Sequence, residues 1–281
     1  MVVPLRVLVL LIATPCCFSA SAGAQEPQVS AQDLAKKAVD NQIKASEQDN
    51  THWLYHDRIE KPNGEIEEKV VIETSKGEIY RVFSVNGNPL NPAQREKEDQ
   101  RIWKLLHDES RQKKAEQSEA QDAEKMDKVM KVLPQALLFS YGSRKEDAIQ
   151  LLFKPNPAFH PQSREEHVLN ALAGSMWVDA KTNRIKEISG HLIHEVRFGG
   201  GILGHLDQGG QFQVLLSEVV PGLWQMTTLN VHLKGKALFF NTISVQQSES
   251  RSDFRRVADN LTLAQAAEAL AQPSRLAQVE K

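Results

Sequence analysis

The segment with the clearest potential for chemistry is the glycine-rich stretch FGGGILGHLDQGGQF, residues 198–212. Its Gly199, Gly201 and Gly204 have the spacing G-x-G-x-x-G of a dinucleotide-binding loop, in which a strand turns tightly into a helix that binds the pyrophosphate. The residues after Gly204 predict another strand and no helix. We therefore interpret the glycines as a wide turn with bulges between two strands, and we expect no cofactor.

Two histidines in HLIHE, residues 191–195, suggest a metal site, because the letters are those of some zinc peptidase motifs. Such motifs need a helix, where residues three and four apart share a face. Here the pattern alternates as a strand, so His194 lies among apolar side chains and His191 points to the opposite face. We expect His194 to be a core residue or a polar group in an apolar cavity. A zinc site built from His205 and Asp207 across the glycine turn remains a further possibility.

Composition excludes several other classes of function. The sequence has no G-x-S-x-G nucleophile elbow, Walker loop or EF-hand loop. Its two cysteines, Cys16 and Cys17, precede the expected mature chain, which excludes disulfides and thiolate chemistry there. With 34 basic and 36 acidic residues the net charge is −2, which does not favour nucleic acid as a partner.

The first residues are typical of an exported protein. Arg6 precedes a short apolar run, and Ala22-Gly23-Ala24 offers a cleavage site, so residues 1–24 predict a signal peptide and a periplasmic location. No later segment approaches the roughly 18 apolar residues that a membrane-spanning helix needs.

Hydrophobic periodicity predicts the elements that would position a site. A helix begins at Ser30, and residues 53–60, 65–74 and 78–85 form an antiparallel meander. In the second strand the apolar side chains share one face, and Glu67, Lys69 and Glu73 point to the other, solvated face. Residues 92–139 predict a charged helical insertion in two segments. A short helix follows Ser163, and the strands continue to about residue 247.

We therefore predict an α+β fold: a curved antiparallel half-barrel of about nine strands with helices on its concave face. One domain spans residues 25–250, and residues 251–281 form a polar tail with one possible short helix. A sheet of this size leaves apolar inner surface that few helices can cover, which indicates an apolar groove. The residues expected to line it are Trp53, Tyr55, Phe83, Phe153, Trp177, Leu192, His194, Phe198, Trp224 and Phe239.

This order of elements resembles the periplasmic lipoprotein-carrier superfamily, the LolA/LolB-like proteins and their sigma-factor regulatory relatives. The local match is Met176-Trp177-Val178-Asp179 followed by Thr182. The resemblance implies a half-barrel closed by helices that holds acyl chains. Arg58 and Arg81 lie on early strands, but no position matches the carriers' lipid-handling arginine. The charged segment 92–131 also departs from the compact carrier pattern.

Three functions follow as hypotheses. The first is a non-enzymatic envelope protein that binds a lipid or lipoprotein acyl chain by apolar burial, with weak selectivity for the headgroup. The second is an interaction or sensor module whose groove is filled and whose charged arm binds an envelope protein partner. The third is a metal-dependent envelope hydrolase that uses His194 or the His205–Asp207 pair.

Overall fold

A single antiparallel sheet of thirteen strands organises the computed structural model, which describes residues 29–201, 203–237, 241–272 and 275–280. The expected signal peptide and Phe239 lie outside the described residues. The strands are β1 (Trp53–Glu60), β2 (Ile66–Thr74), β3 (Gly77–Val85), β4 (Asn88–Pro89), β5 (Leu137–Arg144), β6 (Ala148–Pro155), β7 (Leu172–Asp179), β8 (Ile185–Leu192), β9 (Val196–Phe198), β10 (Gly204–Leu206), β11 (Gln211–Val220), β12 (Leu223–Ala237) and β13 (Asn241–Arg256).

The sheet is open, with the order β4-β3-β2-β1-β13-β12-β11-β8-β7-β6-β5. Strand β10 pairs with β12 and with β9, outside this order. The expected α+β class and antiparallel sheet are confirmed, but the expected nine strands are too few. Strand β5 was missed because α3 ends at Ala136 and the strand begins at once, with no turn residue between them.

The helices are α1 (Ala31–Gln48), α2 (Pro92–His107), α3 (Glu109–Ala136), α4 (Arg164–Leu169), α5 (Leu263–Ala271) and α6 (Leu276–Val279). As predicted, Ser30 caps α1: its hydroxyl accepts a hydrogen bond from the Asp33 amide at 3.0 Å. The expected insertion is α2 and α3, which end three residues before the predicted boundary. None of the described helices is long and apolar enough to cross a membrane.

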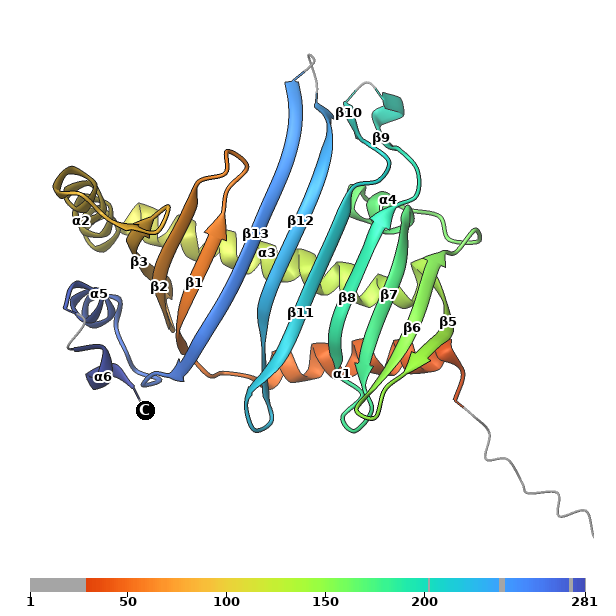
Figure 1. Cartoon of the computed structure of the whole chain (residues 1–281), viewed down its shortest axis with the longest axis horizontal. Coiled ribbons are helices and arrows are strands. Elements are labelled where there is room, and N and C mark those ends of the chain that lie inside the picture. The colour runs from red at the N-terminus through yellow and green to blue at the C-terminus, as the bar shows by residue number, and fades with distance from the viewer. Residues whose placement is uncertain (1–28, 202, 238–240, 273–274, 281) are drawn as a thin grey trace, which may run out of the picture.

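Helices α1 and α3 lie behind the sheet in Figure 1, and the face toward the viewer carries no long helix in its centre. We call these the helix side and the open side. On the helix side, α1 and the end of α3 pack on β5–β8 in the largest core cluster, which includes Leu34, Leu133, Leu151 and Met176. This core holds one half of the sheet against the helices.

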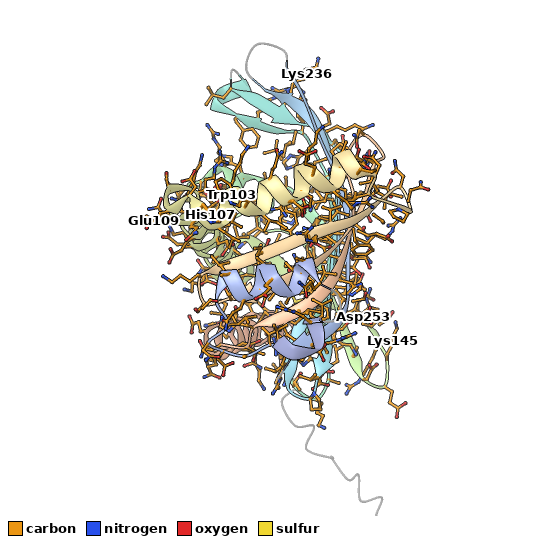
Figure 2. The ribbon with its side chains drawn as sticks, turned by 90° about the vertical axis from the view of Figure 1, so that its left-hand side faces the viewer. Trp103, His107, Glu109, Lys145, Lys236 and Asp253 are labelled. Atoms are coloured by element: carbon orange, nitrogen blue, oxygen red, sulfur yellow. The ribbon has the colours of Figure 1, made fainter. Side chains whose placement is uncertain are left out.

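Helix α5 covers the opposite face at the other end of the sheet. It packs on Leu54, Ile72 and Ile79 together with Ile102 of α2. Figure 2, viewed onto this end, shows α2 and α5 in front of the strands. The short helix predicted after residue 250 is present as α5, but the rest of the prediction of a polar tail is wrong, because β13 continues to Arg256 and α5 contributes buried apolar side chains to this core.

Candidate functional site

The predicted groove residues do not form one lining. Four of them are fully buried core residues and cannot face an open groove: Trp53, Tyr55, Phe153 and Leu192. Phe83 and Trp177 lie on the open side, next to His56 and Lys145 respectively, and Phe198 and Trp224 are half-buried near the ends of the sheet.

His194 is exposed, contrary to the expected core position. Strand β8 ends at Leu192, whose amide donates to the Gly210 carbonyl, and Ile193 donates to the Ala171 carbonyl. The chain then leaves the sheet before His194, so strand alternation no longer decides where that side chain points. A short 3-10 turn at Gly199–Gly201 follows β9, so the predicted turn is present. The stretch also contains strand β10, which the sequence did not predict.

Three side chains of metal-ligating types, Glu195, His205 and Asp207, lie together at the base of this β9–β10 ribbon. His205 Nε2 is 3.3 Å from Asp207 Oδ1 and 3.9 Å from Glu195 Oε2. The three ligand atoms lie within 4.8 Å of one another. Glu195 also forms a 2.5 Å ion pair with Arg197, and both side chains are exposed. Sequence reasoning found His205 and Asp207 but missed Glu195, which directly precedes β9 across the turn.

The centre of the helix side carries a half-buried group of apolar side chains, which we call the central patch: Val214, Leu229 and Val231. Val214 is opposite both Leu229 of β12 and Ile188 of β8, and Val231 is opposite Phe212. Since Ile188 and Phe212 pack against the core under α1 and α3, the central patch faces the same side as these helices. Yet its three residues belong to none of the core clusters found in the described part of the chain.

Helix α3 passes behind β11, β12 and β13 in Figure 1. Every residue from Lys113 to Met126 is exposed, although a helix packed on a sheet buries one side. Within this span the Glu119 carboxylate meets the sheet only at its edge, where it accepts a hydrogen bond of 3.4 Å from the Glu78 amide. The central patch therefore lies under a helix that leaves it partly uncovered.

Charged side chains lie next to the central patch on the helix side, between β12 and the β2 end of the sheet. Leu229 is opposite Glu249, and Arg251 is opposite Asp57, which is in turn opposite Lys69. Lys69 Nζ is 3.1 Å from Asp57, and Arg251 is 2.6 Å from Glu249. The predicted alternation of β2 is confirmed, since Val70 and Ile72 face α5 and Lys69 faces the helix side. The face that carries Lys69 is not solvated as expected, because only 13% of the Lys69 side chain is exposed beside Asp57.

Helix α2 adds a third pair at the free edge of β3. Glu98 accepts a hydrogen bond of 2.9 Å from the Val82 amide, and Arg101 donates to the Tyr80 carbonyl at 2.5 Å. Arg101 also forms an ion pair of 2.7 Å with Glu98. These bonds satisfy backbone groups that an edge strand otherwise leaves open.

Burial and neighbouring charges set the protonation of this region. Burial raises the pKa of Asp57, and the nearby Glu249 carboxylate raises it further. The pKa of Glu98 is lowered despite its burial, because Arg101 and the Val82 amide stabilise its charged form. Burial also raises the pKa of Tyr55 well above its usual range.

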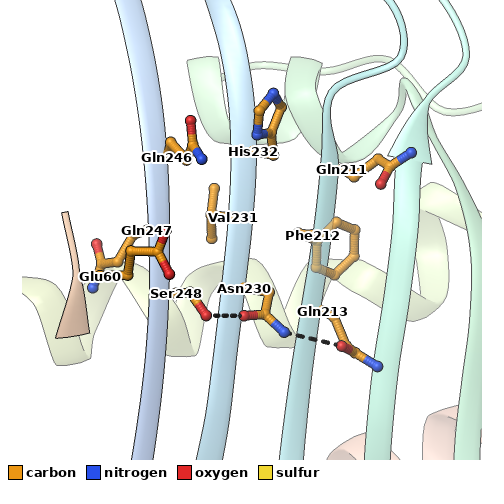
Figure 3. A pocket seen from close by; sticks show the side chains of 10 residues that line it. All are labelled: Glu60, Gln211, Phe212, Gln213, Asn230, Val231, His232, Gln246, Gln247 and Ser248. Carbon is orange, nitrogen blue, oxygen red and sulfur yellow. Dashed lines mark hydrogen bonds between the residues drawn. The ribbon is translucent and has the colours of Figure 1, made fainter. Parts of the chain in front are cut away.

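A pocket of about 350 Å³ lies across β1, β11, β12 and β13 (Figure 3), and most of its lining side chains are polar and belong to the open side. Ser248 donates to Asn230 at 2.7 Å, Asn230 donates to Gln213 at 3.1 Å, and Gln213 donates to Glu187 at 3.0 Å. This chain of hydrogen bonds orders the amides across four strands. Phe212 and Val231 also line this pocket, so its wall is both polar and apolar.

Comparison with models of known protein families, with curated proteins and with solved structures finds no match to this chain. The geometry of the two faces therefore provides the basis for assigning a function. Of these, the helix side combines an uncovered apolar centre with buried charges, a combination that a sheet packed only for stability does not need.

Proposed function

We propose that this is an exported envelope protein that holds the acyl chain of a lipid or lipoprotein against the helix side of its sheet. The observation that carries the proposal is the central patch: three apolar side chains in the middle of the helix side that no core cluster includes, beneath a span of α3 that is exposed on all sides. The order of elements and the open antiparallel sheet are compatible with a half-barrel of the lipoprotein-carrier type, with export by the N-terminal signal peptide.

Binding would come from apolar burial beneath α3. Each buried methylene contributes about 0.8 kcal/mol, which is about a fourfold change in affinity. The chain would extend from the central patch toward Phe212 and Ile188, where the apolar face continues under α1. No covalent step is involved.

A series of saturated fatty acids of increasing length, below their critical micelle concentrations, tests this proposal by isothermal titration calorimetry. We expect the dissociation constant to fall about fourfold with each added methylene until the patch is covered. Leu229→Glu places a charge in the central patch and should abolish binding. Leu152→Glu is the matched control, because Leu152 is 43% exposed on the open side. Equal affinity at all lengths, or equal loss in both variants, would refute the proposal.

One observation favours the second candidate, an interaction module. Trp103 of α2 is 59% exposed, and its ring is stacked on His107 at 4.5 Å, next to the start of the charged helix α3 (Figure 2). A partner protein that covers Trp103 would explain this exposure. Trp103→Ser should then abolish cross-linking of this protein to its partner in the native envelope, while acyl-chain binding stays unchanged. A cross-linking pattern unchanged by the substitution would exclude this candidate.

A further inference from the structure

Three ion pairs at the β1–β3 end of the helix side share one arrangement. In each, the carboxylate is the more deeply buried partner. The exposed side-chain fractions are 13% for Lys69 against 2% for Asp57, 34% for Arg101 against 9% for Glu98, and 25% for Arg251 against 6% for Glu249. The cations therefore form the accessible layer, and the carboxylates lie behind them.

Aromatic rings fix these cations in place. Lys69 Nζ lies 4.6 Å and the Arg101 guanidinium carbon 3.9 Å from the centre of the Tyr80 ring. The Arg251 guanidinium carbon lies 5.0 Å from the centre of the Tyr55 ring. Cations held over rings and backed by carboxylates lose little freedom on binding an anion, which makes them suitable ligands for a carboxylate or phosphate.

This layer adjoins the central patch directly. Glu249, the partner of Arg251, is opposite Leu229, and Gln247 is opposite Val231. Directly opposite residues on paired strands are about 5 Å apart between Cβ atoms. On this face of the sheet, an apolar surface and a cationic surface are therefore neighbours on adjacent strands. This arrangement is complementary to an amphiphile, whose apolar chain would cover the first surface and whose anionic head would bind the second.

We propose that the ligand of this protein carries an anionic head, a carboxylate or a phosphate, that Lys69, Arg101 and Arg251 bind while its chain covers the central patch. This inference rests on the proposed function and replaces the expected weak selectivity for the headgroup. Two further acids lie on this face. Glu67 is already paired with Lys61 at 2.5 Å. Glu73 interacts with Arg251, but burial raises its pKa to about 7, so at lower pH it is neutral and competes little for these cations.

Amphiphiles with the same dodecyl chain and different heads test the inference. The probes are laurate, dodecyl phosphate, dodecyltrimethylammonium and dodecanol, titrated below their critical micelle concentrations. We expect the two anions to bind at least about tenfold more tightly than the other two, and this preference to shrink as salt is added. Whichever anion binds more tightly identifies the head as a carboxylate or a phosphate.

Substitutions of single cations test which side chains cause the preference for anionic heads. Lys69→Gln should weaken binding of the anions about tenfold and leave dodecanol unaffected, because a charge-assisted hydrogen bond is lost. Arg251→Gln leaves Glu249 buried without its partner, so the double variant Arg251→Gln with Glu249→Gln tests the same cation without an unpaired charge. Lys154→Gln, at an exposed position on the open side, is the control.

The outcomes separate the two proposals. Equal affinity for all four heads would overturn the anionic-head inference and leave acyl-chain binding standing. Tighter binding of the ammonium probe would also overturn it. If none of the four probes binds, the proposed function itself is wrong and this inference is wrong with it.

Discussion

Glu73 of β2 provides a quantitative test of the charge arrangement on the helix side. Its carboxylate accepts a hydrogen bond of 3.1 Å from the Trp53 amide and is opposite Glu78 on β3. Burial, reinforced by the Glu78 charge, raises the pKa of Glu73 from 4.5 to about 7. The folded protein therefore keeps a proton on Glu73 at pH values where the unfolded chain has released it.

The sign and size of the effect follow from linkage. Since the folded-state pKa is the higher one, the stabilisation is complete below about pH 4.5 and is lost as the pH rises toward about 7. The shift is worth about 3 kcal/mol of unfolding free energy. Glu73→Gln keeps an oxygen for the Trp53 amide but cannot ionise, so it should remove this dependence.

Urea denaturation at about pH 5 and about pH 8 measures the free energy of unfolding of the native chain and of the Glu73→Gln variant. Relative to Glu73→Gln, the native chain should lose about 2.5 kcal/mol of unfolding free energy between the two pH values. Glu165→Gln, at an exposed position on α4, is the control and should behave as the native chain. If Glu73→Gln shows the same pH dependence as the native chain, the carboxylate is not buried as described.

Three further substitutions test the scaffold. Ser30→Ala removes the cap of α1 and should cost about 1 kcal/mol of unfolding free energy in urea titration, whereas a loss near zero would mean that the cap is not formed. Leu151→Ala empties a fully buried position in the core under α1 and should cost about 2–5 kcal/mol, measured in the same way, whereas a cost below 1 kcal/mol would place Leu151 at the surface. Gly235→Ala would place its Cβ 2.1 Å from the His205 carbonyl oxygen, so β10 should separate from β12 and the amides of residues 204–206 should exchange faster with solvent; unchanged exchange would contradict the close packing of these strands.

Local sequence patterns predict where the helices and strands of this protein lie better than they predict what those elements pair with or pack against. Ser30 and the apolar spacing after it indicate α1 because capping and periodicity act within a few residues. The continuation of β13 through Arg256 is not visible locally, since residues 246–253 are polar and are held in place by pairing with β1 and β12. Tertiary pairing overrides composition at this point.

The candidate site was only partly predictable for a related reason. Alternation shows that Lys69 and Val70 face opposite sides of β2, but it does not show which side α5 covers. Aromatic residues such as Trp53 and Tyr55 indicated burial correctly, yet they fill the core and leave the uncovered surface to Val214, Leu229 and Val231. The cationic layer depends on Arg251, which lies in the segment expected to be a tail.

The most direct test of acyl-chain binding is methyl NMR of the protein with stearate that carries a nitroxide near the end of its chain. We expect strong broadening of the methyl signals of Val214, Leu229 and Val231, while Leu138 and Leu152 on the open side stay sharp. Broadening confined to the open side, or no broadening at saturating ligand, would show that the helix side does not hold an acyl chain.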